Sequence, residues 1–137
     1  MTLISLFIPC YNEEKIIGTN IPRIFTFLKT LPWKFEVFLV NDNSFDNTFE
    51  IAKGLKKKYN SLRILNYYKG PSRRENLAHS FKKSNGDIIV FMDMDLATDL
   101  SYLRNLIQEI IDGNDIATGS RHIEGAKSNR LISRRMI

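Results

Sequence analysis

The sequence predicts an α/β protein in which a mainly parallel sheet carries helices on both faces. Short apolar runs alternate with longer segments of helical periodicity, and this alternation is typical of successive βαβ units. The run Ile88–Met92 holds five apolar residues, three of them β-branched, and it ends at a pair of carboxylates. We therefore expect this run to be the central strand, buried on both faces.

The first strand and helix occupy the start of the chain. Leu3–Pro9 is an apolar strand, and Pro9 ends it because proline has no amide hydrogen for the next rung of the sheet. Acidic residues suit the first turn of a helix, so the following helix is expected to begin near Glu14. Pro22 interrupts the helical pattern, and we expect it to open a second helical piece that runs to Leu31.

The second unit repeats this order. The apolar strand Phe35–Val40 ends in a polar stretch. Asn47 and Glu50 have the spacing of a capping box for a helix that runs to about Tyr59, and Asp46 is a second candidate for the cap.

The remaining elements complete the alternation. A short strand over Leu62–Asn66 precedes a helix from about 73 to 84. After the central strand, a helix from about 100 to 112 stops at Gly113, and a fifth strand is expected over Asp115–Thr118. The buried side chains expected on these two helices are Leu77, Phe81, Leu103, Leu106, Ile107, Ile110 and Ile111.

The composition is that of one globular domain over residues 1–137, with 43% hydrophobic and 26% charged residues. A single cysteine, Cys10, excludes a disulfide framework and favours a reducing cytoplasm. The chain has no secretory signal and no run of about 18 apolar residues, so we expect it to be neither exported nor membrane-spanning. Because the sequence stops in a charged stretch, we expect the domain to be truncated at Ile137.

Positive charge is concentrated at the end of the chain. The net charge is +5, and from Thr118 onward five basic residues accompany one acidic residue, Glu124. Such a cluster is compatible with phosphate, nucleic acid, an acidic membrane surface or a solvated face. The basic residues are Arg121, Lys127, Arg130, Arg134 and Arg135.

Two aspartates directly follow the predicted central strand. Asp93 and Asp95 are separated by one residue, so on an extended backbone their side chains point the same way and can bind one divalent cation. Ligands of such sheets bind beyond the carboxyl ends of the strands, where Asp42 also lies. The alternatives are a solvent-facing turn for the pair and a helix cap for Asp42.

Glycine loops that bind phosphate are absent. After the first strand the sequence reads Pro-Cys-Tyr-Asn-Glu, which is neither a dinucleotide-binding loop nor a Walker-type loop. A metal on Asp93 and Asp95, assisted by arginines, is the remaining way to balance a diphosphate.

Four ordered blocks of the sequence stand out, at 9–14, 40–48, 86–96 and 119–121. They resemble the successive blocks of family 2 glycosyltransferases, which have the Rossmann-like GT-A fold. The block at 119–121 and the stretch at 130–135 most resemble dolichyl-phosphate mannose synthases and related polyprenyl-phosphate sugar transferases.

The resemblance implies a function for each matching position. Asp42 would accept a hydrogen bond from the base, and Asp93 and Asp95 would hold Mg²⁺ or Mn²⁺ at the diphosphate. The catalytic residues implied are Asp93, Asp95 and Arg121. The implied substrate-binding residues are Pro9, Tyr11, Asn12, Glu13, Asp42, Asp93, Arg121 and Arg134.

The implied reaction is metal-dependent, inverting transfer of a hexose from a nucleotide-diphosphate sugar to a polyprenyl or dolichyl phosphate. The donor is GDP-mannose or UDP-glucose, and the sequence does not choose between them. The resemblance places the enzyme at the cytoplasmic face of a membrane surface, with no nucleic acid partner. Two alternatives stay open: transfer to a glycan hydroxyl, and nucleotide-sugar binding without turnover.

Four positions differ from the sequences that the chain resembles. Ala97 stands where those synthases often have a metal-binding glutamine, so water, the diphosphate or Asp99 would complete the metal shell. Asn41 stands where an aspartate is frequent. Arg73 and Arg74 replace small glycines in the segment that follows the third strand.

Overall fold

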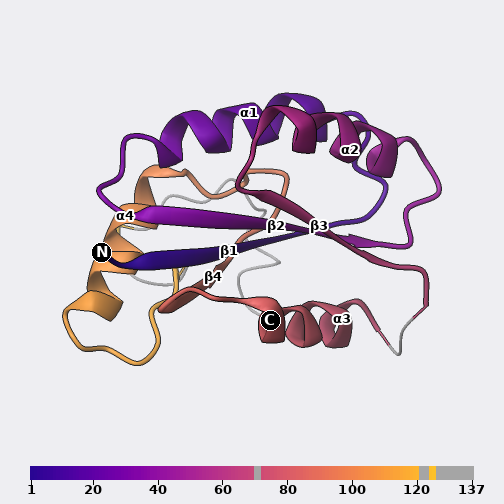
Figure 1. Ribbon diagram of the computed structural model, residues 1–137. Helices are drawn as coiled ribbons and strands as arrows, with labels where there is room; N and C mark the ends of the chain where they lie inside the picture. Colours follow the sequence, from indigo (N-terminus) through magenta and orange to yellow (C-terminus); the bar gives the residue numbers. More distant parts are fainter. Residues whose placement is uncertain (70–71, 121–123, 126–137) are drawn as a thin grey trace. The chain divides into compact units, whose positions relative to one another are not determined.

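The computed structural model describes residues 1–69, 72–120 and 124–125 (Figure 1). The chain forms two compact units, Met1–Leu100 and Ser101–Ile137. The second unit contains helix α4, Ser101–Ile111, which is followed by Gly113 at a φ of 109°, close to the predicted stop. That residues 1–137 form a single domain stays a prediction. No helix in the described part has the length and apolarity needed to cross a bilayer.

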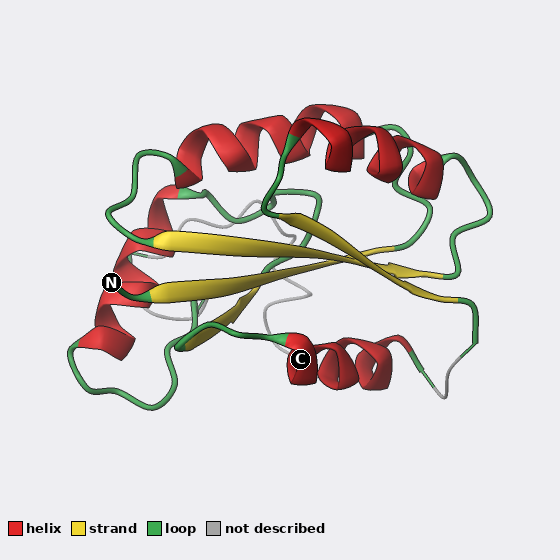
Figure 2. Ribbon diagram, in the orientation of Figure 1, coloured by secondary structure: helices red, strands yellow, loops and turns green. Residues whose placement is uncertain are grey.

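The first unit is built on a four-stranded sheet in which every neighbouring pair is parallel (Figure 2). The predicted parallel α/β architecture is thereby confirmed. In space the order is β3-β2-β1-β4, so the first two strands are central and the last two lie at the edges. The strands are β1 Leu3–Cys10, β2 Lys34–Asp42, β3 Leu62–Tyr67 and β4 Ile88–Phe91.

Helices cover both faces of this sheet. Figure 1 shows α1, Ile17–Leu28, and α2, Thr48–Lys58, on one face, and α3, Arg73–Ser80, on the other. On the α3 face the rings of Phe7 and Phe38 stack with their centroids 4.6 Å apart.

Two predicted core residues pack against this aromatic pair. Phe81 meets the Phe7 ring edge-on at a centroid distance of 5.0 Å, and Leu77 packs against the same cluster. The predicted buried side of α3 is therefore confirmed, although the α-helix ends at Ser80 and a short 3-10 turn follows it.

Helix α1 continues through Pro22, so the predicted division into two pieces is wrong. Proline removes one helical hydrogen bond, and its ring crowds the carbonyl four residues earlier, which here belongs to Gly18. The helix buries four isoleucine and phenylalanine side chains on both sides of this position, and their burial outweighs one lost bond. The helix also begins at Ile17, because residues from Glu14 onward form a turn first.

At the start of α2, the predicted capping box is wrong, whereas the second candidate for the cap, Asp46, makes a capping contact. Asn47 makes no side-chain capping hydrogen bond, so the capping box is wrong. The carboxylate of Asp46 accepts the Thr48 amide hydrogen at 2.9 Å instead. Glu50 pairs with Lys53 on the next turn at 2.7 Å.

Strand β4 lies at an edge of the sheet, so the prediction of a central strand buried on both faces is wrong. Within the described residues it pairs with β1 alone, and Phe91 is 63% exposed. An apolar run indicates a strand, but whether both faces are buried depends on neighbours that the run does not encode.

The predicted fifth strand is also absent. Asp115–Thr118 is described and has no strand conformation, and Ile116 is 85% exposed. Its short apolar run pairs with no strand in the described residues, and without a neighbouring strand its backbone groups cannot form a ladder.

A buried carboxylate joins β1, β2 and the segment before β4 at the amino edge of the sheet. Glu36 accepts hydrogen bonds from the Ser5 hydroxyl and the Asn85 amide, both at 2.6 Å. Gly86 then donates its amide hydrogen to Ser5 Oγ at 2.9 Å. Burial raises the pKa of Glu36, but these hydrogen bonds and the nearby Arg63 outweigh burial and lower it below its usual value.

Candidate functional site

The carboxyl ends of the strands meet at one edge, as the parallel topology requires. Cys10 lies opposite Asn41, and Asn41 lies opposite Asn66, so three strands end at the same level. The side-chain Nδ2 of Asn41 donates to Asn66 Oδ1 at 2.7 Å and links the ends of β2 and β3. Of the predicted site residues, Asp42 is the last residue of β2, and Pro9 lies within β1, which continues to Cys10, so the prediction that Pro9 ends this strand is wrong. The other described site residues lie in the loops after β1 and β4.

The loops after β1 and β2 are joined by reciprocal hydrogen bonds. Asn12 donates its amide hydrogen to Ser44 Oγ at 3.0 Å, and its side-chain oxygen accepts from the Phe45 amide at 3.0 Å. Asn12 has a positive φ of 52°, a conformation that asparagine tolerates better than most residues. The Asn12 side chain, which the resemblance placed in the nucleoside pocket, therefore holds the two loops together.

A second set of bonds extends this connection. Glu13 donates its amide hydrogen to Thr48 Oγ1 at 2.8 Å, and Glu14 donates to the Asp46 carboxylate at 3.1 Å. Since Asp46 also caps α2, the first loop is fixed to the start of that helix. A loop held in this way presents its side chains in a defined geometry.

Tyr11 and Asp42, the two residues expected to bind the base, both contact Arg73. The Arg73 guanidinium lies 3.5 Å from the centre of the Tyr11 ring. Its Nε is 3.6 Å from one carboxylate oxygen of Asp42, and the other oxygen accepts from Asn76 Nδ2 at 2.9 Å. The Tyr11 ring and the Asp42 carboxylate, which could stack on a base and accept a hydrogen bond from it, therefore lie close together. Arg73 contacts both of them.

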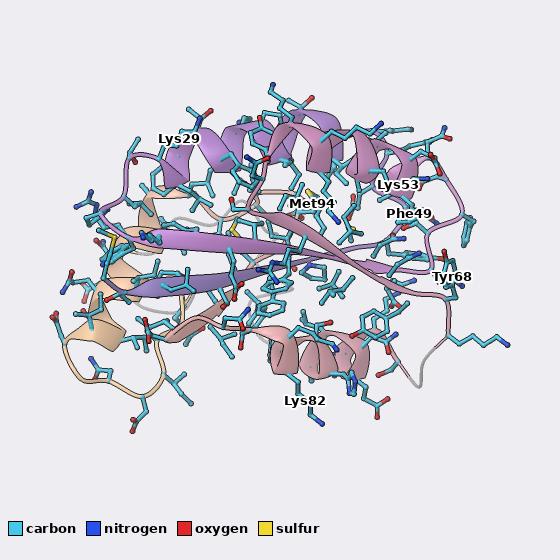
Figure 3. The ribbon with its side chains drawn as sticks, viewed as in Figure 1. Lys29, Phe49, Lys53, Tyr68, Lys82 and Met94 are labelled. Atoms are coloured by element: carbon cyan, nitrogen blue, oxygen red, sulfur yellow. The ribbon has the colours of Figure 1, made fainter. Side chains whose placement is uncertain are left out.

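The two aspartates of the predicted metal site flank a buried residue. Met94 is buried, and Figure 3 shows it between the sheet and α1, while Asp93 and Asp95 are exposed. The Met94 carbonyl accepts a hydrogen bond from Asn20 Nδ2 on α1 at 2.9 Å. Asn20 therefore fixes the turn that carries both carboxylates.

Negative charge accumulates around this turn. The pKa of Glu13 is raised, first by burial and then by the charges of Asp95, Asp46 and Asp93. Neither Asp93 nor Asp95 forms an ion pair with any lysine or arginine that the structure describes.

The donor set fits a hard divalent cation. Exposed carboxylate oxygens are the ligands that Mg²⁺ and Mn²⁺ prefer. One Asp95 oxygen accepts from the Ala97 amide at 3.0 Å, which leaves the other for a ligand. Within residues 1–69, 72–120 and 124–125, no group of three or more histidine, cysteine or acidic side chains has the geometry of a complete metal shell. A bound cation would thus need donors from water or from a ligand.

Cys10 lies beside this edge but is not a nucleophile. It is buried, and its pKa rises to about 12 because of burial and the charges of Glu13, Asp46 and Asp42. The thiol therefore stays protonated near neutral pH.

Two predicted site residues, Arg121 and Arg134, lie outside the described residues, as do the other arginines and the lysine of the basic end. Sequence reasoning missed Asn20 and Asn76, which orient the site carboxylates or their backbone. A signal for Asn20 existed, because it is a polar residue on the apolar face of α1.

The family is decided by a sequence profile. The profile of glycosyl transferase family 2 matches residues 5–136, which is nearly the whole chain. The chain belongs to glycosyl transferase family 2. This family 2 chain is 35% identical over 124 residues to a dolichol-phosphate mannosyltransferase of Pyrococcus furiosus, a match that covers 90% of the chain and 34% of that relative. It is 31% identical to the dolichyl-phosphate beta-glucosyltransferase ALG5C of Trichomonas vaginalis, covering 97% of the chain and 43% of that relative.

The fold is also shared with solved structures. The mannosyltransferase PcManGT from Pyrobaculum calidifontis, in complex with GDP-Man and Mn²⁺, superposes with a TM-score of 0.67 at 21% identity. The match covers 80% of the family 2 chain and 32% of PcManGT. This likeness confirms the Rossmann-like GT-A fold, and the chain spans about a third of the length of that protein and of the Pyrococcus relative.

Proposed function

We propose that the protein containing this chain transfers a hexose from a nucleotide-diphosphate sugar to a polyprenyl phosphate. The observation that carries the proposal is the meeting, at one sheet edge, of the Tyr11 and Asp42 pair with the turn of Asp93 and Asp95. Family membership and the names of the relatives support the same reaction.

The nucleoside would bind between the first two loops. Tyr11 offers a ring face for the base, and Asp42 offers a carboxylate that accepts from a base N–H. Arg73 now covers the ring and pairs with the carboxylate. The base would therefore enter by displacing Arg73, and the loop bonds of Asn12 would keep Tyr11 in position.

Asp93 and Asp95 would hold a divalent cation at the diphosphate. When bound, such a cation stabilises the negative charge that develops on the departing nucleoside diphosphate. The structure supports this assignment through the charge around Glu13 and the absence of described cationic partners for the two aspartates. Asn20 would contribute by fixing the backbone between them.

The acceptor phosphate would react without a strong general base. A phosphate monoester has its second pKa at about 6, so the attacking oxygen is already anionic near neutral pH. That oxygen forms a bond to the anomeric carbon while the bond to the diphosphate oxygen breaks, and attack from the opposite side inverts the configuration. We assign Arg121 and Arg134 to phosphate binding and the reaction to the cytoplasmic face of the membrane, both as parts of this proposal.

The test is a transfer assay with the full-length protein. Radiolabelled GDP-mannose and UDP-glucose are each offered with a short polyprenyl phosphate and Mn²⁺, and lipid-linked hexose is counted. Asp95→Asn is expected to abolish transfer, whereas Asp115→Asn, which changes an exposed acid that is not among the predicted site residues, should retain it. Transfer to a soluble glycan alone, or full activity of Asp95→Asn, would contradict the proposal.

A further inference from the structure

Positive charge is concentrated a second time, in the middle of the chain. From Ile51 to Arg74 there are eight lysines and arginines and no aspartate or glutamate. The whole chain holds 20 basic and 15 acidic residues, so the rest of it holds 12 and 15 and is net negative. The eight residues, called here the basic β3 side, are Lys53, Lys56, Lys57, Lys58, Arg63, Lys69, Arg73 and Arg74.

The fold brings these charges to one side of the sheet. Seven of them lie on α2, on β3 and at the start of α3, Lys69 lies in the loop after β3, and all eight are exposed. Figure 1 shows β3 running between α2 on one face and α3 on the other. Because β3 is an edge strand, the basic residues surround that edge from both faces.

Three of the eight charges are compensated locally. Arg63 lies 3.6 Å from Glu36, and the pairs of Lys53 and Arg73 were described above. The other five form no ion pair with any acid in the described residues. These five are Lys56, Lys57, Lys58, Lys69 and Arg74.

Structural roles account for only part of this charge. Lysines in the last turn of α2 favour the helix dipole, and a basic residue on an edge strand discourages pairing with other chains. Lys69 lies in neither a helix nor a strand, so neither reason applies to it. Neither reason explains why the stretch contains no acid at all.

Exposed aromatic rings accompany the charge at the carboxyl edge. Tyr68, beside Lys69, is 69% exposed, and Phe45 in the loop after β2 is 78% exposed. Figure 3 shows Tyr68 at the end of the view where β2 and β3 end. Aromatic and basic side chains together suit the interface between a bilayer and water. Asp42 lies at this same edge, so a surface docked here would be close to the site.

We propose that the basic β3 side docks on an anionic lipid bilayer. The proposal rests on the proposed function, because a polyprenyl phosphate is held in a bilayer and the enzyme must reach it there. Nucleic acid would offer the same phosphate charge. The bilayer is favoured because the basic β3 side extends to the carboxyl ends of the strands, where the candidate site lies. The exposed rings of Phe45 and Tyr68 lie there as well.

The test compares two charge-matched variants of the full-length protein. In K56Q/K57Q/K69Q three unpaired charges of the basic β3 side are removed. In the control K29Q/K82Q/K83Q three exposed lysines elsewhere are removed; Figure 3 shows Lys29 at the end of α1 and Lys82 below α3. Neither set touches a residue of the candidate site. Binding is measured by co-sedimentation with vesicles of phosphatidylcholine, alone or with about one third phosphatidylserine.

The wild type should bind the anionic vesicles and release them as salt is raised. Each lysine near such a surface contributes about fivefold to binding, so K56Q/K57Q/K69Q should bind about a hundredfold more weakly. The control should bind like the wild type. The proposal is overturned if the wild type does not bind, if both variants lose binding equally, or if a DNA or RNA duplex binds more tightly than the vesicles at the same salt.

A parallel transfer assay in detergent micelles separates this proposal from the proposed function. There the acceptor is presented without a bilayer, so K56Q/K57Q/K69Q should transfer hexose as the wild type does. Vesicle binding without any transfer in micelles would refute the proposed function alone. Transfer in micelles with no vesicle binding would refute the docking surface alone.

Discussion

Replacing Arg73 by alanine should strengthen nucleotide binding. The guanidinium stacks on Tyr11 at 3.5 Å and pairs with Asp42 at 3.6 Å, and both are the groups that a base would use. A ligand that displaces Arg73 must break both contacts before it gains its own. Removing Arg73 in advance removes that cost.

The size of the effect follows from the exposure of the arginine. An exposed ion pair contributes about 0.2 to 1 kcal/mol. A cation–π contact at an exposed site contributes about 0.5 to 1 kcal/mol. Since Arg73 is exposed, the two together amount to about 0.7 to 2 kcal/mol, which corresponds to about a threefold to thirtyfold gain in affinity.

Isothermal titration calorimetry with UDP and GDP in the presence of Mn²⁺ measures this gain. Arg74→Ala is the matched control, because Arg74 is the exposed neighbour of the same charge and contacts neither Tyr11 nor Asp42. A lower affinity in Arg73→Ala, with Arg74→Ala unchanged, would refute the displacement argument. It would mean that the guanidinium assists the bound nucleotide.

Three further predictions concern the elements that hold the site and the sheet. Gly86→Ala should destabilise the fold by about 1 to 3 kcal/mol in chemical denaturation, because an added Cβ would lie 2.5 Å from Ser5 Oγ. The control is Gly54→Ala, which should not destabilise the fold because no atom lies within 4 Å of its added Cβ. Since the folded pKa of Glu36 lies below its ordinary value of 4.5, its contribution to stability is complete above that pH and is lost as the pH falls through the folded pKa. In Glu36→Gln the free energy of unfolding should therefore fall less between neutral and acid pH than it does in the wild type. An equal fall in both proteins, measured by chemical denaturation, would contradict this prediction. Asn20→Ala should weaken Mn²⁺ binding in calorimetry about tenfold while the circular dichroism spectrum is retained, because second-shell hydrogen bonds of this kind position ligands.

The sequence predicted the elements whose signals are local. Apolar runs located the strands to within a few residues, and the helical spacing of Leu77 and Phe81 identified the buried side of α3. Asp42 was expected directly after the second strand, and the structure has it as the last residue of β2. That a ligand binds at this edge stays a prediction.

The features that sequence reasoning missed depend on neighbours distant in the chain. Pro22 breaks an isolated helix, but packing of the flanking isoleucines keeps α1 continuous. The exposure of Phe91 depends on which strand lies beside β4, and no local pattern contains that information. Arg73 was identified as a departure from the resemblance, yet its contact with Tyr11 joins segments 62 positions apart and could not be read from either one.

Carboxylates at the amino ends of the strands differ in their partners from those at the carboxyl ends, and this difference distinguishes a structural carboxylate from candidate functional ones. At the amino edge, Glu36 is buried and every oxygen has a donor, so its charge is fully satisfied within the fold. At the carboxyl edge, Asp93 and Asp95 are exposed and have no described cationic partner, and the pKa of Glu13 is raised, first by burial and then by the charges of Asp95, Asp46 and Asp93. A fold that needed these carboxylates only for stability would be expected to pair them as it pairs Glu36. On the proposal that these two carboxylates bind a divalent cation, added Mn²⁺ should raise the thermal midpoint of the wild type and leave that of Asp95→Asn nearly unchanged.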